Sequence, residues 1–141
     1  MVVSSKSVEI VRKSYSRCCM RDEFFEIFYN DLLKQSSEIE DLFKNTDWYK
    51  QKSLIKSAIK SAIMFAGNPE LYIAREHLEK IAITHSHTHM NIKPEYYPIW
   101  RECMIRTVKK CDPNYSWITG RAWQKVLTFT INFMISKYDA V

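Results

Sequence analysis

The stretch IAITHSHTHMNIKPEYYPIW, residues 81–100, holds three of the four histidines of this 141-residue chain. Its first half alternates histidine with β-branched or small residues, a pattern that also occurs in β-strands. On a strand, the HxHxH run would place all three histidines on one face, where they would present metal ligands together. On a helix, His85 would instead continue the apolar face of Leu78 and Ile81, and His87 would point away.

The rest of the chain favours the helical alternative. It contains only two glycines and four prolines, which leaves little of the sequence for tight turns or hairpins. A strand at the histidines would need a sheet to join, and no other segment has a convincing strand pattern. We therefore expect an all-α fold with one domain over residues 1–141, because a chain of this length buries a single core.

Apolar residues recur every three or four positions along most of the chain. The clearest stripe, with lysines on the opposite side, consists of Leu54, Ile55, Ala58, Ile59, Ala62 and Ile63. The sequence Gly67-Asn68-Pro69 ends this helix, since proline cannot continue it. Helices are expected from the start to about residue 16, over 22–34 and 37–43, from the polar corner 44–47 to 67, through 78–82 to the histidines, over 94–110 and over 116–138.

Composition excludes several classes of protein. The net charge of +5 is dispersed, without the basic cluster or recognition motif of a nucleic-acid partner. No run approaches the ~20 apolar residues of a membrane helix. The start of the chain is unlike a secretory signal, so we expect a cytoplasmic protein. The four cysteines include the adjacent pair Cys18 and Cys19 and no CxxC motif, which favours reduced thiols.

Three segments, in order and correctly spaced, resemble bacterial globins. Residues 81–100 resemble the segment in which an apolar helix delivers a histidine and a PExYPI-like sequence opens the next helix. The segment FFEIFYNDLLKQSSEIEDLF, residues 24–43, resembles the second and third helices, and AWQKVLTFTINFMISKY, residues 122–138, resembles the closing helix. The resemblance implies the globin fold, a three-over-three helical sandwich around one haem b (iron protoporphyrin IX).

The resemblance assigns residues to both faces of the haem. His85 corresponds to the axial iron ligand, for which a neutral imidazole is well suited. Tyr29 and Gln51 fall on the opposite, distal side, where a phenol and an amide stabilise the partial negative charge of bound O₂. Ile55, one turn after Gln51, corresponds to the apolar residue above the iron. If the link before this helix shifts by one residue, Lys50 or Lys52 takes the distal position instead.

Other residues are expected around the haem. The phenylalanine that packs on the porphyrin corresponds to Phe43. The remaining candidate walls are Phe28, Ile59, Ile81, Ile92 and Trp100. His89 and Arg75 are candidates for the haem propionates, while His77 is assigned no role. Tyr97 corresponds to a residue beside the axial histidine.

The departures from the flavohaemoglobin pattern bear on function. In that type a tyrosine at the position of Tyr97 and a glutamate on the last helix form a polar network with the histidine. The position that matches the glutamate is Tyr138 in this chain. We also expect no reductase domain after this one. Both features disfavour a dedicated nitric-oxide dioxygenase or peroxidase.

Reversible binding of O₂, with NO and CO as further ligands, is therefore the expected function, for transport, storage or scavenging. The alternatives are a nitric-oxide dioxygenase served by a separate reductase, a haem-based gas sensor, and a haem-free interaction module with a zinc-binding histidine cluster.

Overall fold

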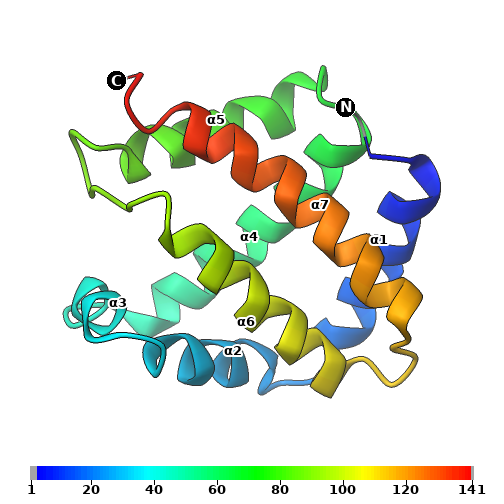
Figure 1. Cartoon of the computed structure of the whole chain (residues 1–141). Helices are drawn as coiled ribbons and strands as arrows, with labels where there is room; N and C mark the ends of the chain where they lie inside the picture. The colour runs from blue at the N-terminus through cyan, green and yellow to red at the C-terminus, as the bar shows by residue number, and fades with distance from the viewer. Residues whose placement is uncertain (1–2, 141) are drawn as a thin grey trace.

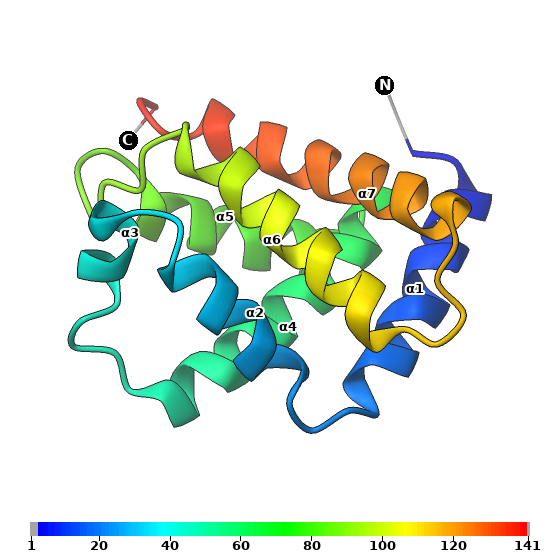
Figure 2. The ribbon, with the colours of Figure 1, turned by 60° about the horizontal axis from the view of Figure 1, so that its bottom comes forward.

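The computed structural model describes residues 3–140, and all the regular secondary structure in this range is helical. Seven helices follow one another, namely α1 (Ser5–Cys19), α2 (Phe24–Leu33), α3 (Ser37–Leu42), α4 (Trp48–Gly67), α5 (Tyr72–His85), α6 (Tyr96–Cys111) and α7 (Trp117–Ser136). Helices α1, α4 and α5 pack as one layer, and α2, α6 and α7 as the other (Figures 1 and 2). The expected all-α, three-over-three arrangement is confirmed.

Helix starts are fixed by short polar side chains, which accept hydrogen bonds from otherwise unpaired backbone N–H groups. Ser4 accepts from the N–H of Ser7 at 3.2 Å, and Ser36 accepts from that of Ile39 at 3.1 Å. Asp47 accepts from the N–H of Lys50 at 3.2 Å and so sets where α4 begins. The predicted stop at Gly67-Asn68-Pro69 marks the end of α4.

Several predicted boundaries were wrong by one to three residues. Helix α1 continues beyond residue 16 to Cys19, because its buried face of Val11, Tyr15 and Cys18 runs on. Helix α2 begins at Phe24, two residues later than the expected start at residue 22. The two ends near the histidines also differ: α6 begins at Tyr96, after a turn at Pro94, and α7 ends at Ser136.

The hydrophobic core lies between the two layers and contains the largest fully buried side chains, among them Trp123, Phe24 and Phe28. A smaller cluster of Phe65, Ala74 and Leu78 fills the space where α4 and α5 meet. The predicted stripe on α4 is confirmed except at its start, where Leu54 is exposed. Because Ile55 points inward instead, the apolar stripe of α4 begins one residue later than the pattern predicts.

Within residues 3–140, no helix combines the length and the apolar character that crossing a lipid bilayer requires.

Candidate functional site

The end of α5 places His85 at one end of the molecule, near the loop that leads to α6 (Figures 1 and 2). Its Nδ1 lies 2.8 Å from the carbonyl oxygen of Ile81. Since a carbonyl only accepts, Nδ1 carries the proton and Nε2 keeps a lone pair. Burial lowers the pKa of His85, although the bond to Ile81 partly opposes this shift, so the ring is neutral at neutral pH. A neutral, oriented imidazole with one unprotonated nitrogen is a suitable metal ligand.

The loop after His85 is folded back by backbone hydrogen bonds. The N–H of Ile92 donates to the carbonyl of His85 at 2.9 Å, and that of Asn91 donates to Ser86 at 2.9 Å. Asn91 has a φ of 54°, a left-handed conformation that asparagine tolerates better than most residues. These bonds hold the ring in place after the helix ends, and residues 81–85 are helical, so the strand alternative is wrong.

Tyr138 attaches the end of the chain to this loop. Its carbonyl accepts from the N–H of His87 at 2.9 Å, and its hydroxyl donates to the side chain of Asn91. The His87 ring packs edge-on against the Tyr138 ring at 5.7 Å. Burial, together with the nearby Tyr138, raises the pKa of Tyr97 to about 12. Tyr97 and Tyr138 are thus close enough to interact electrostatically, but both are phenols and neither supplies the negative charge of a glutamate.

Tyr29 on α2 and Gln51 on α4 form a side-chain hydrogen bond between the two helices. The Gln51 amide donates to the Tyr29 hydroxyl with an Nε2–Oη distance of 2.9 Å. Tyr29 is only 6% exposed, and burial raises its pKa to about 12 even though the bond to Gln51 favours ionisation. The phenol therefore keeps its proton at neutral pH and has it free to donate. Gln51, rather than Lys50 or Lys52, reaches Tyr29, since both lysines are exposed.

Aromatic rings surround this pair. Tyr29 meets Phe28 at 4.9 Å and Phe43 at 5.6 Å, and Phe28 meets Trp100 at 5.4 Å. Trp48, which sequence analysis did not select, stacks on Phe43 at 5.8 Å and meets the edge of Tyr29 at 5.1 Å. The signal that would have found Trp48 is its spacing, because it lies one helical turn before Gln51 on the same face of α4.

The remaining predicted wall residues divide by burial. Ile55 and Ile59 belong to the core, whereas five others are only half-buried, namely Phe43, Ile81, Ile92, Tyr97 and Trp100. These five come from α5, α6 and the loops beside α3 and α5, the same end of the molecule as His85. Partly exposed apolar side chains beside an imidazole lone pair fit a large, flat apolar group with a metal at its centre, as haem is.

The two candidates for the haem propionates lie in different places. His89 is exposed, with its Nδ1 at 3.1 Å from the Ser86 hydroxyl. Arg75 lies near the start of α5, over the Phe133 ring at 5.9 Å. Ten residues of helix, about 15 Å, separate Arg75 from His85, so its position gives no support to the expected role, which stays a prediction. His77 pairs with the Ser61 hydroxyl at 2.6 Å, between α4 and α5.

Other parts of the molecule offer no competing centre. In the described range, no three His, Cys, Asp or Glu side chains are grouped to hold a metal ion, so the zinc-cluster alternative finds no support. Two shallow grooves of about 830 and 400 Å³ follow α7 and the N-terminal segment. Neither groove includes any of the predicted site residues.

Comparison with known proteins gives consistent matches. The family model described as Globin matches residues 26–134. Flavohemoproteins from Bacillus cereus and Bacillus anthracis are 29% identical over 114 residues, which cover 77% of this chain but 27% of theirs. The chain thus spans about a quarter of the length of these relatives. A Pseudomonas aeruginosa PAO1 protein, described as structurally highly homologous to a human hemoglobin, aligns with a TM-score of 0.88 and 30% identity, covering 94% of this chain and 98% of that one.

Proposed function

The chain belongs to the globin family, whose members hold haem and bind small gaseous ligands, and we propose that it binds O₂ reversibly, with NO and CO as further ligands. The observation that carries this proposal is the contact between Tyr29 and Gln51, 2.9 Å apart on two different helices. Its two polar groups lie among aromatic rings, where hydrogen bonds to a ligand are strongest.

In this proposal His85 would hold the iron of haem b through Nε2. The bond from Nδ1 to Ile81 fixes the tautomer and the orientation of the ring. The porphyrin would be covered by Phe43, Ile81, Ile92, Tyr97 and Trp100, with Ile55 and Ile59 facing it from α4. His89, at the exposed edge, would meet a propionate. When bound, haem would supply an iron atom that can take a diatomic gas.

Tyr29 and Gln51 would act on the gas ligand as hydrogen-bond donors. Bound O₂ carries partial negative charge, so each donor is worth about 1–3 kcal/mol in a water-poor pocket. Gln51 has two N–H groups, one of which is used on Tyr29, and the second is available for the ligand. The high pKa of Tyr29, about 12, keeps its donor intact throughout the physiological pH range.

A nitric-oxide dioxygenase served by a separate reductase is the second candidate, favoured by the similarity to flavohemoproteins. The proximal side favours O₂ binding instead, because Tyr138 stands where a glutamate is expected and its hydroxyl donates to Asn91. Nitrate production from NO in the presence of a reductase, measured against simple autoxidation, would separate the two functions.

The experiment that tests the axial ligand uses the histidines as matched variants. The chain, expressed with haem available, should give an intense Soret band. His85→Ala should lose haem affinity, whereas His87→Ala should retain the band. A Soret band of full intensity in His85→Ala would overturn the assignment.

The distal assignment is tested by O₂ dissociation. Tyr29→Phe and Gln51→Leu should each release O₂ about five- to 150-fold faster, which corresponds to a loss of about 1–3 kcal/mol. Tyr49→Phe, at a tyrosine that is 92% exposed, is the matched control and should release O₂ at the original rate. Unchanged rates in both distal variants would reject the donor roles.

A further inference from the structure

Trp48 lies on the outer side of Tyr29. It is the first residue of α4, and its ring touches both Tyr29 and Phe43, which come from α2 and from the end of α3. Trp48 is 42% exposed, whereas Tyr29 beneath it is 6% exposed. The indole therefore separates the Tyr29 and Gln51 pair from solvent on this side.

Trp48 is held in place by different contacts from those of Trp123, the tryptophan of the core. Trp123 is fully buried, and its Nε1 donates to the Ser14 hydroxyl at 2.9 Å. No hydrogen bond within residues 3–140 holds the Trp48 indole, which is kept in place by ring contacts alone. Its neighbours Tyr49 and Lys50 are exposed. A rotation of the Trp48 side chain thus breaks ring contacts with Tyr29 and Phe43 but no hydrogen bond.

Gln51 supplies an independent restraint on Tyr29. Its amide donates to the phenol oxygen at 2.9 Å, a bond in which the indole takes no part. Movement of Trp48 therefore changes access to the pair more than it changes the position of the pair. This separation of access from orientation is what a gating residue requires.

We propose that Trp48 is the gate through which gas ligands reach and leave the Tyr29 and Gln51 pair. The proposal rests on the proposed function, because it assigns the entry route of the same site. A gate that blocks entry and exit equally alters both rates by the same factor and leaves the equilibrium affinity unchanged.

The test measures CO association after flash photolysis and O₂ dissociation by stopped flow, in the full-length haem-loaded protein. Trp48→Ala should raise both rates by about two- to tenfold, the range that corresponds to the loss of a ring contact. Trp48→Phe keeps a smaller ring on Phe43 and should give intermediate rates. Tyr49→Ala, which removes an exposed ring from the next position, should leave both rates unchanged.

The C–O stretching frequency of the CO complex is the readout that separates a gate from a positioning residue. It should shift in Tyr29→Phe, which removes a donor, and stay unmoved in Trp48→Ala. A shift of the same kind in Trp48→Ala, or rates equal to those of the unmodified chain, would overturn the gate while O₂ binding stands. A chain that forms no CO complex at all would overturn the proposed function and the gate with it.

Discussion

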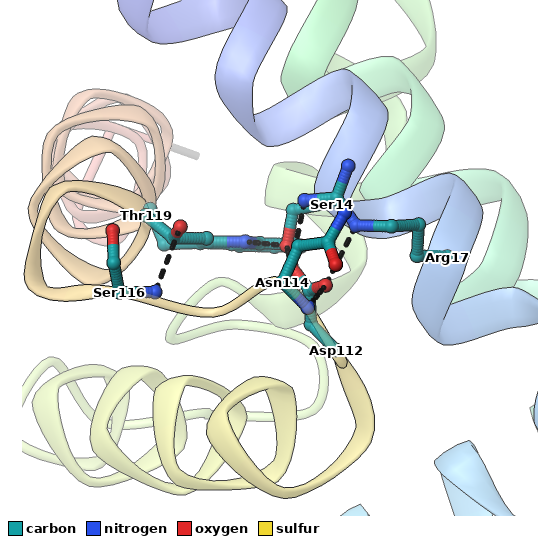
Figure 3. A network of polar contacts seen from close by, with 7 residues as sticks. Ser14, Arg17, Asp112, Asn114, Ser116 and Thr119 are labelled. Atoms are coloured by element: carbon teal, nitrogen blue, oxygen red, sulfur yellow. Dashed lines mark hydrogen bonds and ion pairs between the residues drawn. The ribbon is translucent and has the colours of Figure 1, made fainter.

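Asp112 is the most heavily bonded carboxylate of the molecule and joins α1 to the corner between α6 and α7 (Figure 3). Its side chain has no exposed surface. Arg17 donates to its two oxygens at 2.6 and 2.9 Å, Ser14 donates at 2.6 Å, and the N–H of Asn114 donates at 2.9 Å. Trp123 extends the network by donating to Ser14 at 2.9 Å. Ser14, Arg17 and the N–H of Asn114 therefore all lose a hydrogen-bond acceptor if the Asp112 carboxylate is removed.

Asp112→Ala should lower the free energy of unfolding by about 2–3 kcal/mol, because it leaves Ser14 and Arg17 without their acceptor. Urea denaturation of the haem-free protein, followed by circular dichroism, measures the change. Glu9→Ala is the control, since it breaks the exposed salt bridge between Glu9 and Arg12 on α1 and should leave the unfolding midpoint unchanged. Equal effects of the two substitutions would contradict the role of the buried network.

The same carboxylate predicts a pH dependence. Burial raises the pKa of Asp112, but the hydrogen bonds from Arg17, Ser14 and Asn114 outweigh it and hold the pKa below its usual range. A carboxyl with a depressed pKa stabilises the fold above its unfolded pKa of about 4, and this contribution is lost as the pH falls further. Asp112→Asn should therefore lose less stability than the unmodified chain when the pH is lowered from about 5 to 3, measured by urea denaturation at each pH.

The four cysteines are free thiols and differ in exposure. Burial raises the pKa of Cys18 to about 12 and that of Cys103 to about 11, and it raises that of Cys111 as well. Cys19 is only half-buried, so it should be alkylated first by iodoacetamide near neutral pH, as mapped by mass spectrometry. Cys19→Ser should abolish the early product. Labelling of Cys103 or Cys111 at the same rate would contradict this prediction.

At the scale of elements, sequence predicted what depends on local pattern. Helix α4 was bounded correctly at both ends, because the polar corner 44–47 and Gly67 are local signals. The contact of Gln51 with Tyr29 could only be inferred from family resemblance, since it depends on how the link from α3 turns. Trp48 was missed because its one signal, a position one helical turn before Gln51, points to the site only once Gln51 has been placed there.

The ends of α6 and α7 could not be placed from sequence pattern alone. Pro94 was expected to open α6, but the helix begins at Tyr96, after a turn. The apolar pattern of α7 runs on to Tyr138, but Tyr138 leaves the helix and bonds to the loop that follows α5. This bond joins residues distant in sequence and competes with the last helical turn, so local pattern overestimated the length of α7.

The loop after His85 should be sensitive to Asn91, where a left-handed φ of 54° coincides with a bond from Tyr138. Asn91→Ala should cost about 1–2 kcal/mol through backbone strain, and it also loses the side-chain acceptor. Asn91→Gly should relieve the strain while losing the bond, and Tyr138→Phe should lose the bond alone. Hydrogen exchange of the amides of residues 86–92 measures the stability of this loop. Equal protection in all three variants would contradict separate contributions from backbone strain at Asn91 and from the hydrogen bond of Tyr138.

On the scale of the whole molecule, the two ends differ in how completely they are packed. One end joins α1 to the corner before α7 through buried Asp112 and Trp123. At the other end, near His85, the apolar side chains of Phe43, Ile81 and Trp100 remain half-exposed. Apolar surface that stays in contact with water contributes nothing to stability until something covers it. Haem bound at His85 should therefore stabilise the molecule unevenly.

Removing haem should lower the melting temperature, and adding it back should raise it with haem concentration. The free energy of unfolding should increase by about 2.7 kcal/mol when free haem is at about a hundred times its dissociation constant. Hydrogen exchange should quicken in the haem-free form over α3, the first turn of α4 and residues 86–95, while the amides of Val11 and Trp123 stay protected. His85→Ala should remove most of the haem-dependent rise. If all backbone amides lost protection equally when haem is removed, haem would stabilise the whole fold at once, which would contradict a local effect.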